Sequence, residues 1–330
     1  MTVRRTLMAG LAAGVLLLSA CSTTEDTGDG DDGGGGGGGT DVNPSDIRID
    51  VITHGAPGDS FWDVVKSGAE RAGDDLGVEL SYQSDPDPGA QSTLIDNAVA
   101  DQTDGLVISM ANPEGLEASI KAAVEAGVPV ITINSGLEKF EEFGAITHVG
   151  QSEAIAGTAA GEKLKEANLS NVICVIQEAG NIALEERCRA ATETFEGEMT
   201  NLQTDNTDLV GSQSTIEAEL TADDSVDGIL TLGGDMAGAA VGAAEASGRD
   251  VQIGTFDLNA EVAQDVIDGN LLFAVDQQPY VQGYLGVTGI YLKMINGNDI
   301  GGGQPINSGP AIITEENAED VLGFAEEGTR

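Results

Sequence analysis

The stretch that decides the fold is IDVITHGAPGDSFWDVVKSGAERAGDDLGV, residues 49–78. The β-branched residues at 47–53 predict a strand, and the glycines and proline at 55–58 predict a turn. From Phe61 onward, apolar residues recur at three- and four-residue steps, which predicts a helix. Asp59 or Ser60 can cap this helix. In a parallel α/β sheet, such a turn lies at the carboxyl end of a strand, where ligands bind.

Two adjacent aromatic residues, Phe61 and Trp62, follow this turn, and Trp62 is the single tryptophan of the chain. Neighbouring residues on a helix point about 100° apart, so one ring can face the core while the other faces a crevice. Both rings can equally be packing residues, and the two alternatives stay open at this point.

Strands and helices alternate along most of the chain. Strands are predicted at 47–53, 78–83, 105–110, 128–134, 146–150, 172–177, 199–204, 228–232, 251–256 and 271–276. Helices are predicted at 61–76, 89–100, 113–126, 153–167, 183–195, 209–220, 236–247, 260–268 and 280–295. This alternation of strands and helices predicts an α/β fold of two lobes, each a doubly wound parallel sheet, with a ligand cleft between them.

The chain is expected to pass between the lobes near 149–151, near 277–279 and again after Gly303. We therefore predict an N-terminal lobe of residues 46–149 plus 279–304. The C-terminal lobe is predicted to hold residues 150–278 plus 305–330.

The N-terminus has the features of a secretion signal. Arg4 and Arg5 precede an apolar run at 7–18, which is followed by Leu-Ser-Ala-Cys ending at Cys21. This tetrad resembles the lipobox of bacterial lipoproteins, which implies cleavage after residue 20 and a lipid on the Cys21 sulfur. Residues 21–45 are rich in Gly and Asp and are expected to form a flexible tether.

The formal net charge is −42, and loss of the two signal arginines would bring it to −44. Such acidity argues against nucleic acid as a partner, because phosphate binding needs clustered Lys and Arg. It also argues against long-range capture of anionic ligands. No acidic loop has calcium-binding spacing, and His54 and His148 are the only two histidines. We expect no metal and no cofactor.

The two other cysteines, Cys174 and Cys188, lie in a predicted strand and at the start of the next helix. Outside the cytoplasm such a pair can form a disulfide, which would stabilise the fold by about 3 kcal/mol. The sequence leaves open whether the strand and the helix approach closely enough.

Polar and aromatic residues gather at the predicted strand ends. They are Asp59, Phe61, Trp62, Asn112, Asn134, Ser135, Glu178, Asn181, Arg187, 205–207, 233–235, Asp257, Asn259 and Gln277. Amides and carboxylates suit a ligand with many hydroxyl groups, and aromatic faces suit the C–H faces of a sugar ring. Arg187 could instead pair with Glu185 or Glu186 on its own helix.

No G-x-S-x-G elbow, P-loop or G-x-G-x-x-G follows a strand, so we do not expect an enzyme.

Several segments together resemble the periplasmic sugar-binding proteins of ABC importers, in the ribose- and galactose-binding group with the type I periplasmic-binding-protein fold. They are SFWDVVKSGAE at 60–70, VPVITIN at 128–134, EERCRAATETF at 185–195, GDMAGAAVGA at 234–243, IGTFD at 253–257 and FAVDQQPYVQGYLG at 273–286. The similarity runs from Ile47 to Ile313. It implies a receptor that closes on a sugar, and it argues against a related repressor because no helix-turn-helix is present.

The resemblance also implies the site. The sugar would be lined by Asp59, Phe61, Trp62, Asn134, Arg187, Asp257 and Gln277. The two rings would flank the sugar, Asn134 and Asp257 would accept hydrogen bonds from hydroxyls, Arg187 would donate them, and Gln277 could do either. The ribose-binding pattern has Asp-Arg where this chain has Asn134-Ser135, and Asn-Asp where it has Gly233-Gly234. Asn181 could compensate from the opposite lobe.

We therefore expect a monomeric, extracytoplasmic solute-binding protein, attached to the membrane through lipid at Cys21. It would capture a sugar or polyol and deliver it to an ABC permease. The alternative is a receptor that presents a furanosyl autoinducer, a nucleoside or a sugar to a membrane sensor.

Overall fold

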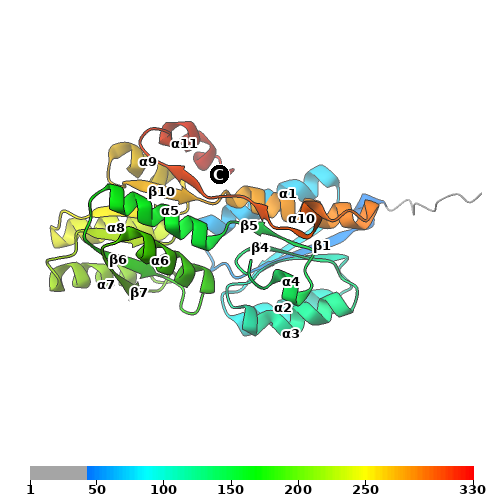
Figure 1. The fold of residues 1–330 in the computed structure, drawn as a ribbon. Helices are drawn as coiled ribbons and strands as arrows, with labels where there is room; N and C mark the ends of the chain where they lie inside the picture. The colour runs from blue at the N-terminus through cyan, green and yellow to red at the C-terminus, as the bar shows by residue number, and fades with distance from the viewer. Residues whose placement is uncertain (1–42) are drawn as a thin grey trace, which may run out of the picture. The chain divides into compact units, whose positions relative to one another are not determined.

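The computed structural model describes residues 43–330, which contain two α/β lobes (Figure 1). The predicted signal, Cys21 and most of the predicted tether lie outside the described residues. The end of the predicted tether is ordered, because Pro44–Asp46 form a short 3₁₀ helix, η1, directly before the first strand.

Each lobe is built on a six-stranded sheet within the described residues. The first sheet has the order β11-β5-β4-β3-β1-β2, and all its neighbours are parallel. The second has the order β12-β10-β9-β8-β6-β7, in which only β12 is antiparallel. The first-sheet strands are β1 Arg48–Thr53, β2 Glu79–Ser84, β3 Gly105–Ser109, β4 Val130–Asn134, β5 Thr147–Gly150 and β11 Ile306–Asn307. The second-sheet strands are β6 Asn171–Ile176, β7 Glu198–Gln203, β8 Gly228–Thr231, β9 Gln252–Phe256, β10 Phe273–Asp276 and β12 Ala311–Ile313.

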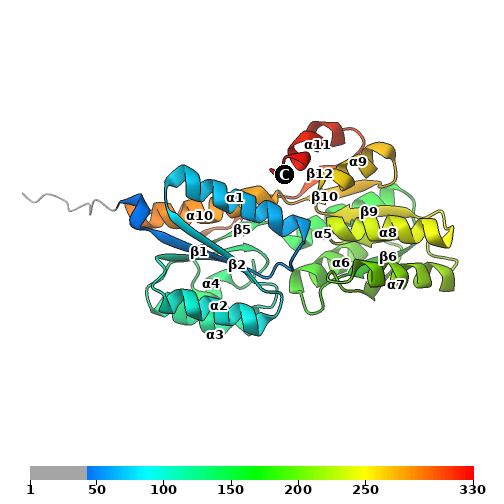
Figure 2. The ribbon, with the colours of Figure 1, turned by 180° about the vertical axis from the view of Figure 1, so that it is seen from behind.

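Helices cover both faces of each sheet, as the two opposite views show (Figures 1 and 2). The first lobe contains α1 Ser60–Leu76, α2 Pro88–Ala100, α3 Pro113–Glu125, α4 Phe140–Phe143, α10 Pro279–Asn296 and the 3₁₀ helix η2 Ile300–Gly303. The second contains α5 Glu153–Glu166, α6 Ile182–Phe195, α7 Leu209–Ala222, α8 Gly234–Ser247, α9 Ala260–Asp268 and α11 Ala318–Glu326. This arrangement confirms the predicted fold class.

Every sheet face carries its own apolar core. In the first lobe, Ile49 and Val51 of β1 pack with α1 and α10, whereas Ile52 packs with α2 and α3. This division follows from the alternation of side chains along a strand. In the second lobe, α5 and α6 cover one face, and α7, α8, α9 and α11 cover the other. The four cores fix the strand ends from which the candidate site is built.

The chain passes between the lobes three times: between β5 and α5, between β10 and α10, and between β11 and β12. The third crossing differs from the predicted one, because β11 pairs with β5 and so belongs to the first lobe. It lies between Asn307 and Ala311, beyond the predicted boundary between residues 304 and 305. A two-residue strand has too few positions to produce a readable pattern. The helices α4 and α11 were not predicted either, since α4 has only four residues and α11 only nine.

Candidate functional site

A cavity of about 600 Å³ lies between the lobes, where strands of both sheets end. This volume is in the range of small-molecule sites. All eight predicted ligand residues line it: Asp59, Phe61, Trp62, Asn134, Asn181, Arg187, Asp257 and Gln277. Ser135, Glu178 and Asp235 also reach it, but Asn112, Asp205 and Asn259 do not. The structure therefore gathers the predicted residues in one place, while their binding roles remain predictions.

The aromatic side of the cavity is held by close packing around Trp62. A Cβ atom added to Gly55 would lie only 2.5 Å from Cγ of Trp62, so the indole packs against bare backbone. The rings of Phe61 and His54 meet the indole edge-on, with centroid distances of 5.0 Å and 4.6 Å. Phe61 and Trp62 also belong to the core of the first lobe. Each ring therefore both packs in the core and borders the cavity.

Asp59 caps α1, because its Oδ1 accepts a hydrogen bond of 3.0 Å from the Phe61 N–H. Burial, together with the nearby carboxylates of Asp235, Glu178 and Asp257, raises the pKa of its carboxyl from 3.8 to about 7. These three carboxylates come from the second lobe. Acidic groups of both lobes therefore lie close together at the cavity wall.

A chain of amide and carboxylate hydrogen bonds connects the lobes at the hinge side. Asn134 Nδ2 donates to Gln277 Oε1 at 3.1 Å, and Gln277 Nε2 donates to Asp257 Oδ1 at 2.6 Å. Asn134 and Asp257 both have left-handed backbone, with φ of 62° and 67°. Such backbone is uncommon for residues other than glycine, although Asn and Asp adopt it more readily than most, and it often occurs at functional sites. Burial raises the pKa of Asp257 to about 7.

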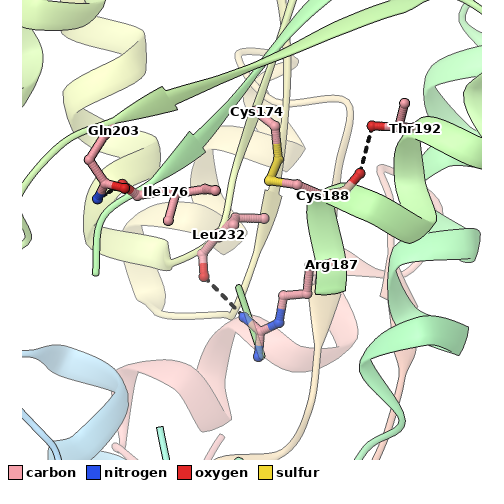
Figure 3. The surroundings of a disulfide bond; sticks show 7 residues. All are labelled: Cys174, Ile176, Arg187, Cys188, Thr192, Gln203 and Leu232. Atoms are coloured by element: carbon pink, nitrogen blue, oxygen red, sulfur yellow. Dashed lines mark hydrogen bonds between the residues drawn. A yellow bond between two sulfur atoms is a disulfide. The ribbon is translucent and has the colours of Figure 1, made fainter. Parts of the chain in front are cut away.

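Arg187 is held by Glu153, at the start of α5. Nε donates to Glu153 Oε2 at 2.6 Å and Nη2 donates to Oε1 at 3.1 Å, while Nη1 donates to the Leu232 carbonyl at 3.1 Å. Figure 3 shows the Leu232 contact. The guanidinium also lies over the Phe256 ring at 4.7 Å. The alternative pairing with Glu185 or Glu186 is wrong. Glu153 was missed because it is 34 residues away in sequence and only the packing of α5 on α6 brings it near.

That packing requires a small residue on α5. A Cβ atom at Gly157 would lie 2.5 Å from the Arg187 carbonyl oxygen and 2.8 Å from the Ala190 Cβ. The two helices can therefore approach closely only because position 157 has no side chain.

The disulfide, whose formation could not be decided from the sequence, is present in the structure. Cys174 of β6 and Cys188 of α6 are joined, with their Cα atoms 6.0 Å apart (Figure 3). The bond connects the strand to the helix that carries Arg187. Asn181 caps this helix, and its Nδ2 donates to Glu178 Oε2 at 2.7 Å.

Polar contacts close the cavity between the lobes. The Ser60 hydroxyl donates to Asp235 Oδ1 at 2.6 Å, and the Asn259 amide donates to that same oxygen at 3.2 Å. On another side, the Ile182 N–H donates to the Ala111 carbonyl at 3.2 Å. The structure thus represents a closed arrangement of the two lobes.

His54 is buried beside Ser109, with Nδ1 at 2.7 Å from the Ser109 hydroxyl. Burial lowers the pKa of the imidazole, and its Nε2 lies 3.8 Å from Glu178 Oε2 across the cavity. His54 therefore faces the site as a neutral group near neutral pH.

Among residues 43–330, no group of three or more His, Cys, Asp or Glu side chains is placed to hold a metal ion. In the same part of the chain, no helix combines the length and apolar character needed to cross a bilayer.

The family described as "Periplasmic binding protein domain" matches residues 49–298. A carbohydrate transporter from Acidothermus cellulolyticus 11B, solved in complex with myo-inositol, is 39% identical with a TM-score of 0.85, covering 86% of this chain and 99% of that one. The xylose/arabinose-binding protein XylF of Sulfolobus acidocaldarius is 25% identical, over 74% of this chain and 66% of that protein. The ribose import binding protein RbsB of Escherichia coli is 25% identical, over 69% of this chain and 78% of that protein. The fold, the interlobe cavity and these matches agree, and the chain belongs to the periplasmic binding protein family.

Proposed function

We propose that this chain is an extracytoplasmic, lipid-anchored solute-binding protein that captures a neutral sugar or polyol and delivers it to an ABC importer. The observation that carries the proposal is the interlobe cavity, with two aromatic rings on one side and amides and carboxylates around it. Family members of this kind are solute-binding proteins, so the chain is not an enzyme. The relatives named for ribose, xylose and arabinose, and the structure with bound myo-inositol, support this ligand class.

The charges around the cavity favour an uncharged ligand. Among the described residues that line the cavity, Arg187 carries the one guanidinium, and it is already paired with Glu153. The carboxylates of Asp59, Glu178, Asp235 and Asp257 also reach the cavity. An anionic sugar would therefore meet four acidic groups and, among the described lining residues, no unpaired cation, in a site where water screens poorly. Phosphorylated and carboxylated sugars should be rejected.

A titration of residues 43–330 followed by Trp62 fluorescence tests this proposal. The panel contains myo-inositol, D-ribose, D-xylose, the corresponding phosphates and two nucleosides. We expect a saturable signal with a neutral polyol or sugar, together with thermal stabilisation. At a ligand concentration one hundred times the dissociation constant, the stabilisation should be about 2.7 kcal/mol. Absence of both signals with every neutral compound would contradict the proposal, and a response to nucleosides alone would favour the alternative receptor.

The lipid anchor is tested by labelling cells that express the full chain with a fatty-acid probe. The labelled protein should partition into the membrane fraction, and Cys21→Ala should lose both the label and the membrane association. Labelling of the Cys21→Ala variant would contradict attachment at this position.

Closure without ligand should weaken as the pH rises. In the closed form the pKa of Asp59 is about 7, above its ordinary value of 3.8, so the closed form holds more protons between these two values. By linkage, the closed form is most favoured below about pH 4, and it loses this advantage as the pH rises to about 7. The radius of gyration of the ligand-free protein, measured by X-ray scattering, should be larger at pH 8 than at pH 5. Asp59→Asn should make this dependence shallower and leave the contribution of Asp257, whose pKa is also raised to about 7. An equally steep change in that variant would contradict the assignment to Asp59.

A further inference from the structure

Gln177 follows β6 directly and was not among the predicted site residues. Its side chain lines the cavity and is 8% exposed. Within the described residues, its Oε1 atom is buried and has no hydrogen-bond partner. Buried amide oxygens are nearly always paired in native proteins, so an unpaired one at a cavity wall calls for a partner that the protein itself does not supply. A hydroxyl group of a ligand is such a partner.

The space that the Gln177 amide occupies explains a glycine on the neighbouring strand end. Gly233 has φ −161° and ψ 149°, which is extended backbone that any residue can adopt. Its lack of a side chain therefore does not follow from its backbone conformation. A Cβ atom at this position would lie 2.8 Å from Gln177 Nε2. At that distance the Gln177 amide would have to move. Gln177 thus fills the place that a side chain at residue 233 would occupy.

The same place borders Asp257. The Cβ position of Gly233 lies 4.0 Å from Asp257 Oδ2, while Oδ1 of that carboxylate already accepts from Gln277. The Gln177 amide and an Asp257 carboxylate oxygen therefore both lie within 4.0 Å of the position that a Cβ atom of residue 233 would occupy. A carboxylate accepts hydrogen bonds, and an amide both donates and accepts them, so the two groups together match neighbouring hydroxyls on one ring.

We propose that Gln177 is a specificity-determining residue that, with Asp257, binds a pair of neighbouring hydroxyl groups of the ligand. This inference rests on the proposed function, since it requires a polyhydroxylated ligand. Gly233 has the role of leaving room for the Gln177 amide. A ligand that lacks the matching hydroxyl would leave the Gln177 oxygen buried and unpaired, and should be discriminated against for that reason.

The test compares Gln177→Met with the wild-type chain, using myo-inositol, D-ribose and D-xylose as probes. Methionine keeps the length of the side chain and removes its amide. We expect affinity for the bound probe to fall at least tenfold, while the unfolding midpoint of the ligand-free protein stays the same or rises. A purely structural role would instead lower that midpoint. Wild-type binding with unchanged affinity in Gln177→Met would overturn the inference and leave the proposed function standing. No binding of any probe by the wild-type chain would overturn both.

A second test moves the amide group from position 177 to position 233. Gly233→Asn alone should weaken binding because its side chain collides with Gln177, and Gln177→Ala alone should weaken binding because the amide is lost. Asparagine is favoured at position 233, which caps α8. The double variant Gln177→Ala/Gly233→Asn should bind at least threefold more tightly than either single variant. If the losses of binding free energy in the two single variants simply add in the double variant, the side chains at positions 177 and 233 do not occupy the same space. That result would overturn the inference.

Discussion

Replacing Arg187 with methionine is expected to abolish ligand binding and to lower the free energy of unfolding by about 3–5 kcal/mol. The side chains of Arg187 and Glu153 are only 3% and 6% exposed, so the substitution leaves a buried carboxylate without its partner. The variant also loses the hydrogen bond to the Leu232 carbonyl and the contact with the Phe256 ring. Urea unfolding measures the stability, and Trp62 fluorescence measures the binding.

A second substitution separates the two effects. In Arg187→Met/Glu153→Met, no charge is left unpaired, so most of the lost stability should return, while binding should not. Arg189→Met is the matched control on the same helix. Its ion pairs with Glu186 and Glu193 are exposed. The free energy of unfolding should therefore change by at most about 1 kcal/mol, and ligand binding should stay intact. A double variant as unstable as Arg187→Met alone would show that the unpaired carboxylate is not the cause.

Reduction of the disulfide is expected to lower the free energy of unfolding by about 3 kcal/mol, because the unfolded chain regains the freedom that the closed loop removes. Cys174 and Cys188 are separated by 14 residues, and both are almost fully buried. The fragment 43–330 contains no other cysteine, since the third one in the chain is Cys21. Denaturant unfolding with and without a phosphine reductant measures the difference.

The variant Cys174→Ala/Cys188→Ala provides the control, because its stability should not respond to the reductant. Thiol labelling under denaturing conditions must show that the wild-type bond has been reduced. Equal stability of the oxidised and fully reduced wild-type protein would contradict the prediction.

The sequence determined most of the architecture. The β-branched run before Gly55 and the helical spacing after Phe61 were enough to place β1, α1 and the turn between them. The same alternation, repeated along the chain, predicted two lobes with a site where the strands end. These features depend on local propensity and on side-chain periodicity, and both can be recognised from residues that are close together in the sequence. The short elements β11, α4 and α11 could not be predicted in this way.

The tertiary structure decided which side chains pair. Glu153 reaches Arg187 because α5 packs closely on α6 at Gly157, and the Gln177 amide lies in the space that a side chain at position 233 would need. The Asn134–Gln277–Asp257 chain of hydrogen bonds likewise forms across the junction of the two lobes. The residues in each of these sets are separated by 20 to 143 positions. Strand and helix patterns carry no information about such distant neighbours, because the contacts arise only when complete elements pack against one another.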